Sequence, residues 1–366
     1  MPHLVAIHLP GGSAWVTALQ QVWDRGDAVL PVDRRLPPPA RATLLHALRP
    51  TRMLDDRGEH ALDGEPCEPG DALVMATSGS TGSPKGVILT HAAVAASAAA
   101  TSARLGTGED DVWVACLPLA HVGGLSVVTR ALHTGAGLVV HDGFDAAKVT
   151  AAAQAGATAI SLVATALARI DPATYRVIVL GGSRPPADRP PNCHATYGLT
   201  ETGSGVVYDG RPLDGVEVRI TDTQEILLRG PMVTRGYRDG TSPVDADGWL
   251  HTGDLGRWND DGTLHVLGRA GDLIITGGEN VWPEVVEAVL ATHPNVAEAA
   301  VRGVPDAEWG QRVEAWIVPA GSPPSLDAVR SHVRRYLPAF CAPKAAHLVP
   351  HLPRTALGKI QRHLLR

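Results

Sequence analysis

The sequence is poor in several features, and each shortage narrows the class of protein. The net charge is −6 and no basic face or tail is present, which argues against a nucleic-acid partner. No apolar run is long enough to cross a bilayer, and the first residues carry no basic segment ahead of an apolar core. We therefore expect no membrane association and no signal peptide, and we expect a cytoplasmic protein.

Cysteine is also scarce. The four cysteines lie far apart and form no C-x-x-C pair; they are Cys67, Cys116, Cys193 and Cys341. This spacing favours reduced thiols over disulfides or a zinc site. The remaining composition, 44% hydrophobic and 19% charged, is that of a globular protein, and 366 residues are enough for two domains.

Lysine is the rarest charged residue, with four lysines against 28 arginines. Arginine serves at most solvated positions, whereas lysine offers a compact ammonium group on a flexible stem. Two of the four lysines, Lys85 and Lys359, lie in short glycine-containing motifs. The scarcity of lysine elsewhere makes these two positions candidates for binding or catalysis.

The segment around Lys85 is the most informative part of the sequence. An apolar run at 72–76 is followed by residues that are nearly all Gly, Ser, Thr, Pro or Lys, and then by a second apolar run at 87–89. Hydroxyl and backbone N–H groups in such a turn bind phosphate oxygens, and Lys85 adds positive charge. Gly86 stands where a Walker loop has Ser or Thr, so this is a phosphate loop of another kind. The residues expected to bind phosphate are Thr77, Ser78, Gly79, Ser80, Thr81, Gly82 and Lys85.

The order of expected elements indicates a parallel sheet covered by helices. Strand patterns such as 4–9 and 28–32 alternate with helical patterns up to about residue 180. From residue 216 short strands separated by turns predict a β-rich subdomain. After Arg269 a compact α+β unit follows, with Pro283 in the first turn of one helix and a second helix near 326–336. We predict a large N-terminal domain over 1–269 and a small C-terminal domain over 270–366.

The phosphate loop and four later motifs, in this order, resemble those of the adenylate-forming superfamily of acyl-CoA synthetases, luciferases and adenylation domains. The later motifs are Tyr197-Gly-Leu-Thr-Glu-Thr202, Gly248-Trp-Leu-His-Thr-Gly-Asp254, Gly268-Arg-Ala-Gly-Asp-Leu-Ile-Ile-Thr-Gly-Gly-Glu-Asn280 and Pro353-Arg-Thr-Ala-Leu-Gly-Lys-Ile360. The resemblance covers the chain from about Asp71 onward. It implies an acid–thiol ligase that uses ATP, Mg²⁺ and coenzyme A, and a mobile C-terminal domain.

A shorter resemblance narrows the subfamily. The segments 208–219 and 342–344, and a reduced region before the phosphate loop, are similar to short o-succinylbenzoate–CoA ligases of menaquinone synthesis. This implies an acyl-AMP intermediate that CoA then cleaves. Three alternatives stay open: another aryl or dicarboxylic acid, transfer to a carrier protein, and an adenylate-binding protein without activity. The presence of Lys359, Glu201 and Asp254 argues against the last alternative. The sequence does not decide between a monomer and a homodimer.

The resemblance also assigns roles to polar residues of the motifs. Glu201 is a hard oxygen ligand suited to Mg²⁺, and Thr200 can donate to the α-phosphate. Asp254 can accept from both ribose hydroxyls, and Arg269 can donate to the ribose or to phosphate. Lys359 resembles the family lysine that bridges the acyl carboxylate and the α-phosphate. Without the motifs, each of these residues would be read as a solvated surface charge.

Aromatic and glycine residues complete the expected nucleotide site. Tyr197 offers a ring face to adenine, and small residues let the backbone approach the base closely. The glycines and serine assigned to cofactor binding are Gly181, Gly182, Ser183, Gly277 and Gly278. Relatives are thought to rotate the small domain about a residue two positions after the motif arginine. That residue here is Gly271, for which the alternative is an ordinary turn glycine that joins the two domains.

The expected acid pocket rests on two residues. His121, within Pro118-Leu-Ala-His-Val-Gly-Gly124, either borders the acyl group or is a core histidine. Nine residues later, Arg130 lies in an apolar run and requires a partner. A second carboxylate of the substrate would bind its guanidinium in a bidentate manner, and a structural salt bridge is the alternative.

Overall fold

The computed structural model describes residues 1–78, 84–182, 186, 188–354 and 360–366. The chain divides into two compact units. The first contains Met1–Arg219, Leu227–Thr252 and Asn259–Leu264, and the second contains Ile220–Ile226, Gly253–Trp258 and His265–Arg366. Residues 270–366 therefore all lie in the second unit, while the exact boundary at residue 269 stays a prediction.

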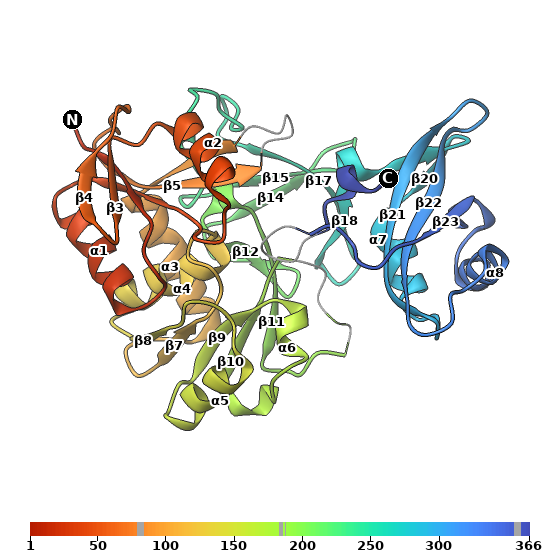
Figure 1. Ribbon diagram of the computed structural model, residues 1–366, viewed down its shortest axis with the longest axis horizontal. Coiled ribbons are helices and arrows are strands. Elements are labelled where there is room, and N and C mark those ends of the chain that lie inside the picture. Colours follow the sequence, from red (N-terminus) through yellow and green to blue (C-terminus); the bar gives the residue numbers. More distant parts are fainter. Residues whose placement is uncertain (79–83, 183–185, 187, 355–359) are drawn as a thin grey trace. The chain divides into compact units, whose positions relative to one another are not determined.

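The first unit contains two seven-stranded sheets (Figure 1). One has the order β16-β6-β5-β2-β1-β3-β4, in which β1 pairs in parallel with β2 and β3, and β2 in parallel with β5. The pairings β5–β6, β6–β16 and β3–β4 are antiparallel. Its strands are β1 (Leu4–Ile7), β2 (Ala28–Pro31), β3 (Arg52–Asp55), β4 (Gly58–Ala61), β5 (Asp71–Ser78), β6 (Pro84–Thr90) and β16 (Gly236–Tyr237).

The other sheet has the order β13-β12-β11-β10-β9-β7-β8. Its strands from β8 to β11 are parallel, and β12 is antiparallel to β11 and β13. Strands β9 and β10 are buried at every residue, as expected for a parallel sheet covered on both faces. The strands are β7 (Val112–Ala115), β8 (Gly137–Val140), β9 (Ala159–Leu162), β10 (Val177–Leu180), β11 (Cys193–Gly198), β12 (Gly205–Tyr208) and β13 (Arg211–Pro212).

Successive side chains of a strand point to opposite faces of the sheet, so the packing of alternate residues shows which helices cover each face. Val5 and Leu73 of the first sheet and Trp113 and Val177 of the second share one core with α1, α3 and α4. The opposite face of the first sheet packs on α2, and the opposite face of the second packs on α5 and α6. The helices are α1 (Ser13–Asp24), α2 (Pro38–Leu48), α3 (His91–Leu105), α4 (Val122–Thr134), α5 (Ala146–Gln154) and α6 (Ala164–Leu167).

A four-stranded sheet in the order β14-β15-β17-β18 corresponds to the predicted β-rich subdomain. Its strands are β14 (Glu217–Ile220), β15 (Glu225–Arg229), β17 (Leu250–Trp258) and β18 (Leu264–Arg269). Five short 3₁₀ helices lie elsewhere in the described chain: η1 (Pro172–Thr174), η2 (Thr200–Thr202), η3 (Ala270–Asp272), η4 (Ala339–Cys341) and η5 (Arg362–Leu364).

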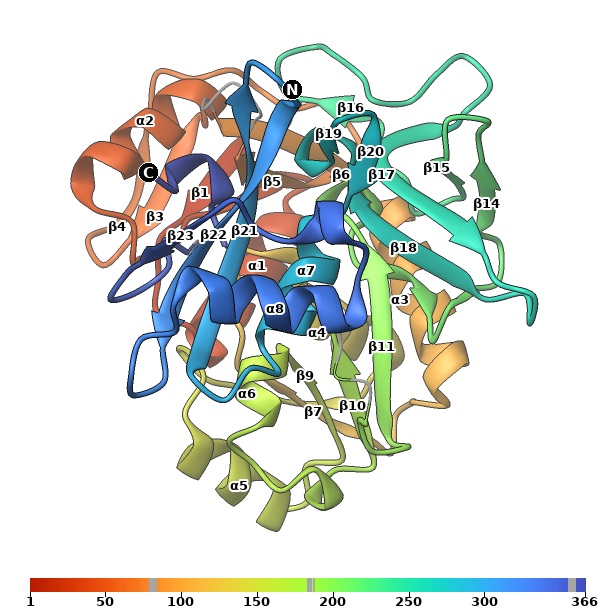
Figure 2. The ribbon, with the colours of Figure 1, turned by 90° about the vertical axis from the view of Figure 1, so that its right-hand side faces the viewer.

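The C-terminal part of the chain has a core of its own (Figure 2). Strands in the order β20-β19-β22-β21, with β23 beside β22, pack one face on α7 and α8. The alternate residues Ala300 and Trp316 face the other way and pack on Leu352 and Leu365. The elements are β19 (Ile274–Thr276), β20 (Glu279–Val281), β21 (Val296–Asp306), β22 (Gly310–Pro319), β23 (Ala345–Leu348), α7 (Pro283–Leu290) and α8 (Leu326–Tyr336).

These observations confirm the predicted fold class, a large α/β region with a β-rich subdomain and a small α+β unit. Pro283 occupies the first turn of α7, as predicted. Within the described residues, no helix is long and apolar enough to cross a membrane.

Candidate functional site

The expected phosphate loop connects two antiparallel strands. Strand β5 ends at Ser78 and β6 begins at Pro84, with Thr77 opposite Lys85. A Cβ atom on Gly86 would lie 2.8 Å from side-chain atoms of Leu48 and Val74, so these side chains would have to shift to admit a larger residue. Close packing thus favours glycine at the position where a Walker loop carries a hydroxyl. The predicted ligands Gly79, Ser80, Thr81 and Gly82 lie outside the described residues.

Tyr237 links Lys85 to Glu201. The Lys85 ammonium nitrogen lies 4.7 Å from the centre of the Tyr237 ring, and the Tyr237 hydroxyl donates a 2.9 Å hydrogen bond to Glu201 Oε1. The Thr234 N–H also donates to the Glu201 carbonyl, at 2.7 Å. The structure therefore brings together two predicted site residues through a third that the sequence analysis missed. The two-residue strand β16 gives no periodicity to detect, and an aromatic residue after Gly236 was the only available signal.

A tight turn after β11 presents Thr200 and Glu201. The buried Thr202 hydroxyl accepts from the Leu199 N–H at 2.9 Å and donates to the Ser204 carbonyl at 2.8 Å. A Cβ atom on Gly198 would lie 2.2 Å from the Ser204 carbonyl oxygen, so glycine is required there. These contacts hold the turn through Thr202 and leave the side chains of Thr200 and Glu201 half-buried.

The glycines expected near adenine lie beside Tyr197. Leu180 at the end of β10 pairs with Ala195 in β11, so Gly181 and Tyr197 follow the same edge of the sheet. Gly182 has a φ of +82°, a conformation that favours glycine. In open α/β sheets this carboxyl edge is where ligands bind. Ser183 lies outside the described residues.

Glu201 is chemically suited to hold magnesium with a nucleotide. Mg²⁺ keeps several waters and is usually held by one or two carboxylates together with substrate phosphates. The described residues contain no group of three or more His, Cys, Asp or Glu side chains that could enclose a metal by themselves. A single carboxylate close to a phosphate loop matches this mode of Mg²⁺ coordination, whereas a site made of protein ligands alone would not.

His121 stands immediately before α4, at its N-cap. Its Nε2 lies 3.8 Å from Asp33 Oδ2 and makes no hydrogen bond to a described residue. Burial lowers the pKa of His121, and the nearby Arg35 lowers it further against the opposing effect of Asp33. The imidazole is therefore neutral at physiological pH and can accept or donate a hydrogen bond.

Arg130 is the most unusual charged residue of the first unit. Its relative exposure is 1%, and its guanidinium carbon lies 4.5 Å from the centre of the Trp113 ring. Nε and Nη1 have no hydrogen-bond partner among the described residues, and no carboxylate there pairs with the side chain. Burial lowers the pKa of Arg130. The structural salt bridge considered from the sequence is therefore not found in the described part of the chain.

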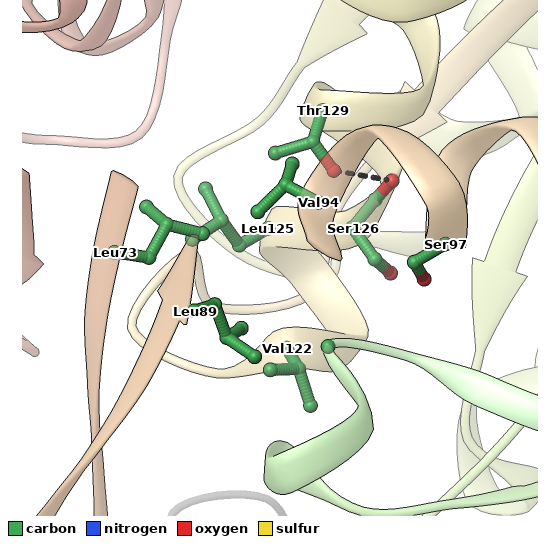
Figure 3. Close-up of a pocket in the computed structure, with 9 residues that line it drawn as sticks. Leu73, Leu89, Val94, Ser97, Val122, Leu125, Ser126 and Thr129 are labelled. Carbon is green, nitrogen blue, oxygen red and sulfur yellow. Dashed lines mark hydrogen bonds between the residues drawn. The ribbon is translucent and has the colours of Figure 1, made fainter. Parts of the chain in front are cut away.

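A small cavity beside α4 does not account for this arginine. Figure 3 shows its lining, in which the Thr129 hydroxyl donates to the Ser126 carbonyl at 3.3 Å. None of its lining residues is charged; they are Leu73, Leu89, Val94, Ser97, Val122, Leu125, Ser126, Thr129 and Gly203. The lining is mostly apolar and supplies no positive charge to neutralise a phosphate or carboxylate, and we assign the cavity no ligand.

In the second unit, Asp254 and Arg269 contact each other directly. Arg269 Nε lies 2.8 Å from Asp254 Oδ1, and the Asp254 side chain is 10% exposed against 47% for Arg269. The motifs predict that both residues bind the same ribose, and their contact places them side by side. A carboxylate accepts several hydrogen bonds, so this ion pair is compatible with a diol ligand.

Gly277 and Gly278 form the two-residue turn between β19 and β20. Their φ angles are +59° and +85°, as in the type I′ hairpin turn. The Gly277 N–H donates to the Trp309 carbonyl at 2.8 Å, and a Cβ atom on Gly277 would lie 2.6 Å from the Trp309 ring. Turn geometry and packing thus suffice to require Gly277, and its role in cofactor binding stays a prediction.

Lys359 lies outside the described residues, whereas the chain on both sides of it is well anchored. Arg354 pairs with Ile360, and the Gln361 N–H donates to the Pro353 carbonyl at 2.8 Å. Arg362 contacts three carboxylates, those of Asp272 at 3.1 Å, Glu284 at 3.0 Å and Glu287 at 2.8 Å. These bonds fix the ends of the segment that carries Lys359.

Comparison with known proteins identifies the family. Residues 53–238 match the AMP-binding enzymes, and residues 285–359 match the AMP-binding enzyme C-terminal domain. The chain is 40% identical, over 392 residues, to a probable 2-succinylbenzoate–CoA ligase of Mycobacterium tuberculosis strain CDC 1551/Oshkosh. That similarity covers 98% of this chain and 97% of the relative.

The fold is similar to solved structures of the o-succinylbenzoate CoA synthetase of Bacillus subtilis. Its complex with the acyl-adenylate intermediate OSB-AMP has a TM-score of 0.89 and 30% identity, covering 100% of this chain and 88% of that one. Its complex with ATP and a magnesium ion has a TM-score of 0.87 and 30% identity, covering 99% and 89%. By these family matches and by 40% identity over nearly its whole length, the chain belongs to the AMP-binding enzyme family.

Proposed function

We propose that this chain is an ATP-dependent acid–CoA ligase that activates 2-succinylbenzoate as an acyl-adenylate and transfers the acyl group to coenzyme A. The names of its relatives support the reaction and the acid. Within this molecule, one observation supports a dicarboxylic acid as the substrate. Arg130 is buried and has no carboxylate partner among the described residues.

Among the described residues Arg130 is an isolated buried charge, and such a charge destabilises a protein. An ion taken out of water loses roughly several kcal/mol even after relaxation, and proteins usually offset this with a paired charge. Trp113 contacts the guanidinium face, and the buried Nε and Nη1 groups have no hydrogen-bond partner among the described residues. The second carboxylate of the substrate supplies that partner in bidentate geometry.

In the adenylation step, Lys85 and the loop residues Thr77, Ser78, Gly79, Ser80, Thr81 and Gly82 hold the β- and γ-phosphates. Thr200 donates to the α-phosphate, and Glu201 holds Mg²⁺, which neutralises phosphate charge when bound. Lys359 stabilises the charge that develops as the acid carboxylate oxygen attacks the α-phosphorus and the bond to pyrophosphate breaks.

The remaining site residues bind the nucleoside. Asp254 accepts from the ribose hydroxyls, and Arg269 orients Asp254 and donates to ribose or phosphate. Tyr197 stacks on adenine, and the residues Gly181, Gly182 and Ser183 admit the base. His121 borders the acyl group at the N-cap of α4.

In the second step the CoA thiolate sulfur attacks the acyl carbonyl carbon, and the bond from that carbon to AMP breaks. Gly277 and Gly278 line the approach of the cofactor in this proposal. The four cysteines are free and buried, in keeping with a reducing compartment, and we place the enzyme in the cytoplasm, where ATP and CoA are available. We assign it no nucleic-acid or membrane partner.

The test is a panel of acids incubated with ATP and Mg²⁺ and scored for pyrophosphate release. We expect release with 2-succinylbenzoate in the absence of CoA, limited to about one equivalent per enzyme, and continuous turnover with CoA. A matched acid without the second carboxylate should react poorly. Turnover with a carrier protein but not with CoA, or preference for a monocarboxylic acid, would contradict the proposal.

A further inference from the structure

We propose that Tyr237 is a positioning residue that sets Lys85 and Glu201 in place for the metal–nucleotide complex. This inference rests on the proposed function, because it assumes that Glu201 holds the magnesium of Mg²⁺–ATP. It adds a residue that belongs to none of the sequence motifs assigned to the site.

Tyr237 contacts both predicted ligands with different parts of one side chain. Its hydroxyl donates to Glu201 Oε1 at 2.9 Å, and its ring face lies 4.7 Å from the Lys85 ammonium nitrogen. A hydrogen bond to one carboxylate oxygen restricts rotation of the Glu201 side chain and keeps its orientation toward a metal. Residues that orient a metal ligand in this way typically affect metal affinity about 10–100-fold.

The ring contact acts on the other ligand. An ammonium group over an aromatic face is attracted by the ring quadrupole, which holds Lys85 while no phosphate is present. Without this contact the long lysine side chain would lose more conformational freedom on binding phosphate. One aromatic residue thus prepares a cation and a metal ligand for the same triphosphate.

The backbone that carries Tyr237 is firmly held. Gly236 and Tyr237 pair with Ile88 and Val87 of β6, the strand that follows the phosphate loop. The buried Thr234 hydroxyl donates to the Ile88 carbonyl at 2.6 Å. The preceding Arg235 makes a bidentate ion pair with Asp71, at 2.7 and 2.9 Å.

These contacts attach the Tyr237 backbone to both strands that flank the loop, since Asp71 begins β5 and Ile88 lies in β6. A side chain on such a support has a defined position before any ligand arrives, which is the requirement for preorganisation.

Two variants separate the hydroxyl from the ring. Tyr237→Phe keeps the ring under Lys85 and removes the bond to Glu201, whereas Tyr237→Leu removes both. The matched control is Tyr175→Phe, because the Tyr175 hydroxyl donates to the Val149 carbonyl, at 2.8 Å, in the core of the same unit. The readout is calorimetric binding of a non-hydrolysable ATP analogue, with saturating Mg²⁺ and with EDTA, and the Mg²⁺ concentration that gives half-maximal binding.

We expect Tyr237→Phe to raise the half-maximal Mg²⁺ concentration about tenfold while analogue binding in EDTA changes little. Tyr237→Leu should weaken binding in EDTA as well, and Tyr175→Phe should change neither quantity. Wild-type Mg²⁺ dependence in Tyr237→Phe, or an equal loss with and without Mg²⁺, would overturn the inference alone. Failure of the wild-type protein to bind the analogue would overturn the proposed function together with it.

Discussion

Two arginines, the buried Arg130 of the first unit and the half-buried Arg362 of the second, differ in the partners that the protein gives them. Arg130 in the first unit is 1% exposed and has no carboxylate partner in the described chain. The side chain of Arg362 in the second unit is 13% exposed and is surrounded by Asp272, Glu284 and Glu287. Burial lowers the pKa of both, but in Arg362 the neighbouring carboxylates reverse the effect and raise it.

This difference distinguishes a charged residue that stabilises the fold from one that binds a ligand. A buried ion that the protein itself neutralises serves the fold, since removing it leaves its partners uncompensated. A buried ion that the protein leaves unpaired weakens the fold unless a ligand completes it. On this reasoning Arg362 anchors the C-terminal segment, and we propose that Arg130 receives substrate.

The largest expected effect comes from Arg362→Ala. Three half-buried carboxylates would lose their cation, and since breaking a fully buried pair costs on the order of 3–5 kcal/mol of unfolding free energy, we expect a loss near the lower end of that range. Urea denaturation followed through the C-terminal unit measures this loss. The matched control is Arg354→Ala. Arg354 forms an ion pair with Glu298 at 2.7 Å, and because this pair is exposed to solvent it should contribute less than about 1 kcal/mol to stability. Equal small losses in both variants would remove the distinction between the two arginines.

Lys359→Ala should act on rate instead of stability. An ammonium group placed for the transition state contributes about 10²–10³ in rate, so acid-dependent pyrophosphate release should fall by that factor while ATP affinity is nearly unchanged. The variant should still convert synthetic acyl-AMP and CoA into thioester. Lys148→Ala, at an exposed position in α5, serves as the control. Adenylation at the wild-type rate would show that the Lys359 ammonium group does not contribute to catalysis of this step.

Two glycines of the second unit give the smallest expected effects, with opposite signs. Gly277→Ala forces a Cβ atom against Trp309 at a φ of +59°, which should cost about 1–2 kcal/mol or more. Gly271 lies in η3, where a Cβ atom would meet no other atom within 4 Å, so Gly271→Ala should stabilise by about 0.4–1 kcal/mol. Thermal unfolding of both variants measures the difference. A change in the ratio of adenylation to thioester formation in Gly271→Ala would support the predicted hinge. Destabilisation by the same substitution would contradict the expectation that the turn accepts a Cβ atom.

Strong local patterns made much of the fold predictable. The helix expected near 326–336 is α8, because Ser325 caps it and Val329 and Val333 repeat on one face. Strands β21 and β22 form a long hairpin that runs out to Asp306 and back from Gly310. Its outer residues are mostly polar, so no core-facing pattern marks them in the sequence. Periodicity detects buried surface, so it misses strands held only by backbone pairing.

The motifs assigned individual residues to the candidate site, and these roles stay predictions, whereas the contacts between the residues could not be predicted from the sequence. Motifs identified Lys85, Glu201, Asp254 and Arg269, yet nothing in the sequence placed Tyr237 between the first two. The burial of Arg130 followed from its apolar neighbours, whereas its stacking on Trp113 depends on a strand seventeen positions earlier. Such long-range pairs arise from tertiary packing, which short windows of sequence do not encode.

The central claim, that Arg130 binds the second carboxylate of the acid, is tested most directly by the KM of Arg130→Ala for two acids. Loss of the charge-assisted hydrogen bonds should weaken binding of 2-succinylbenzoate by about 1.5–3 kcal/mol. The account therefore predicts that the KM for this acid rises roughly tenfold to a hundredfold. The KM for a matched acid without the second carboxylate should hardly change, and the unfolding free energy should fall far less than in Arg362→Ala. Equal losses for both acids, or a collapse in stability, would show that Arg130 is structural and would contradict the account.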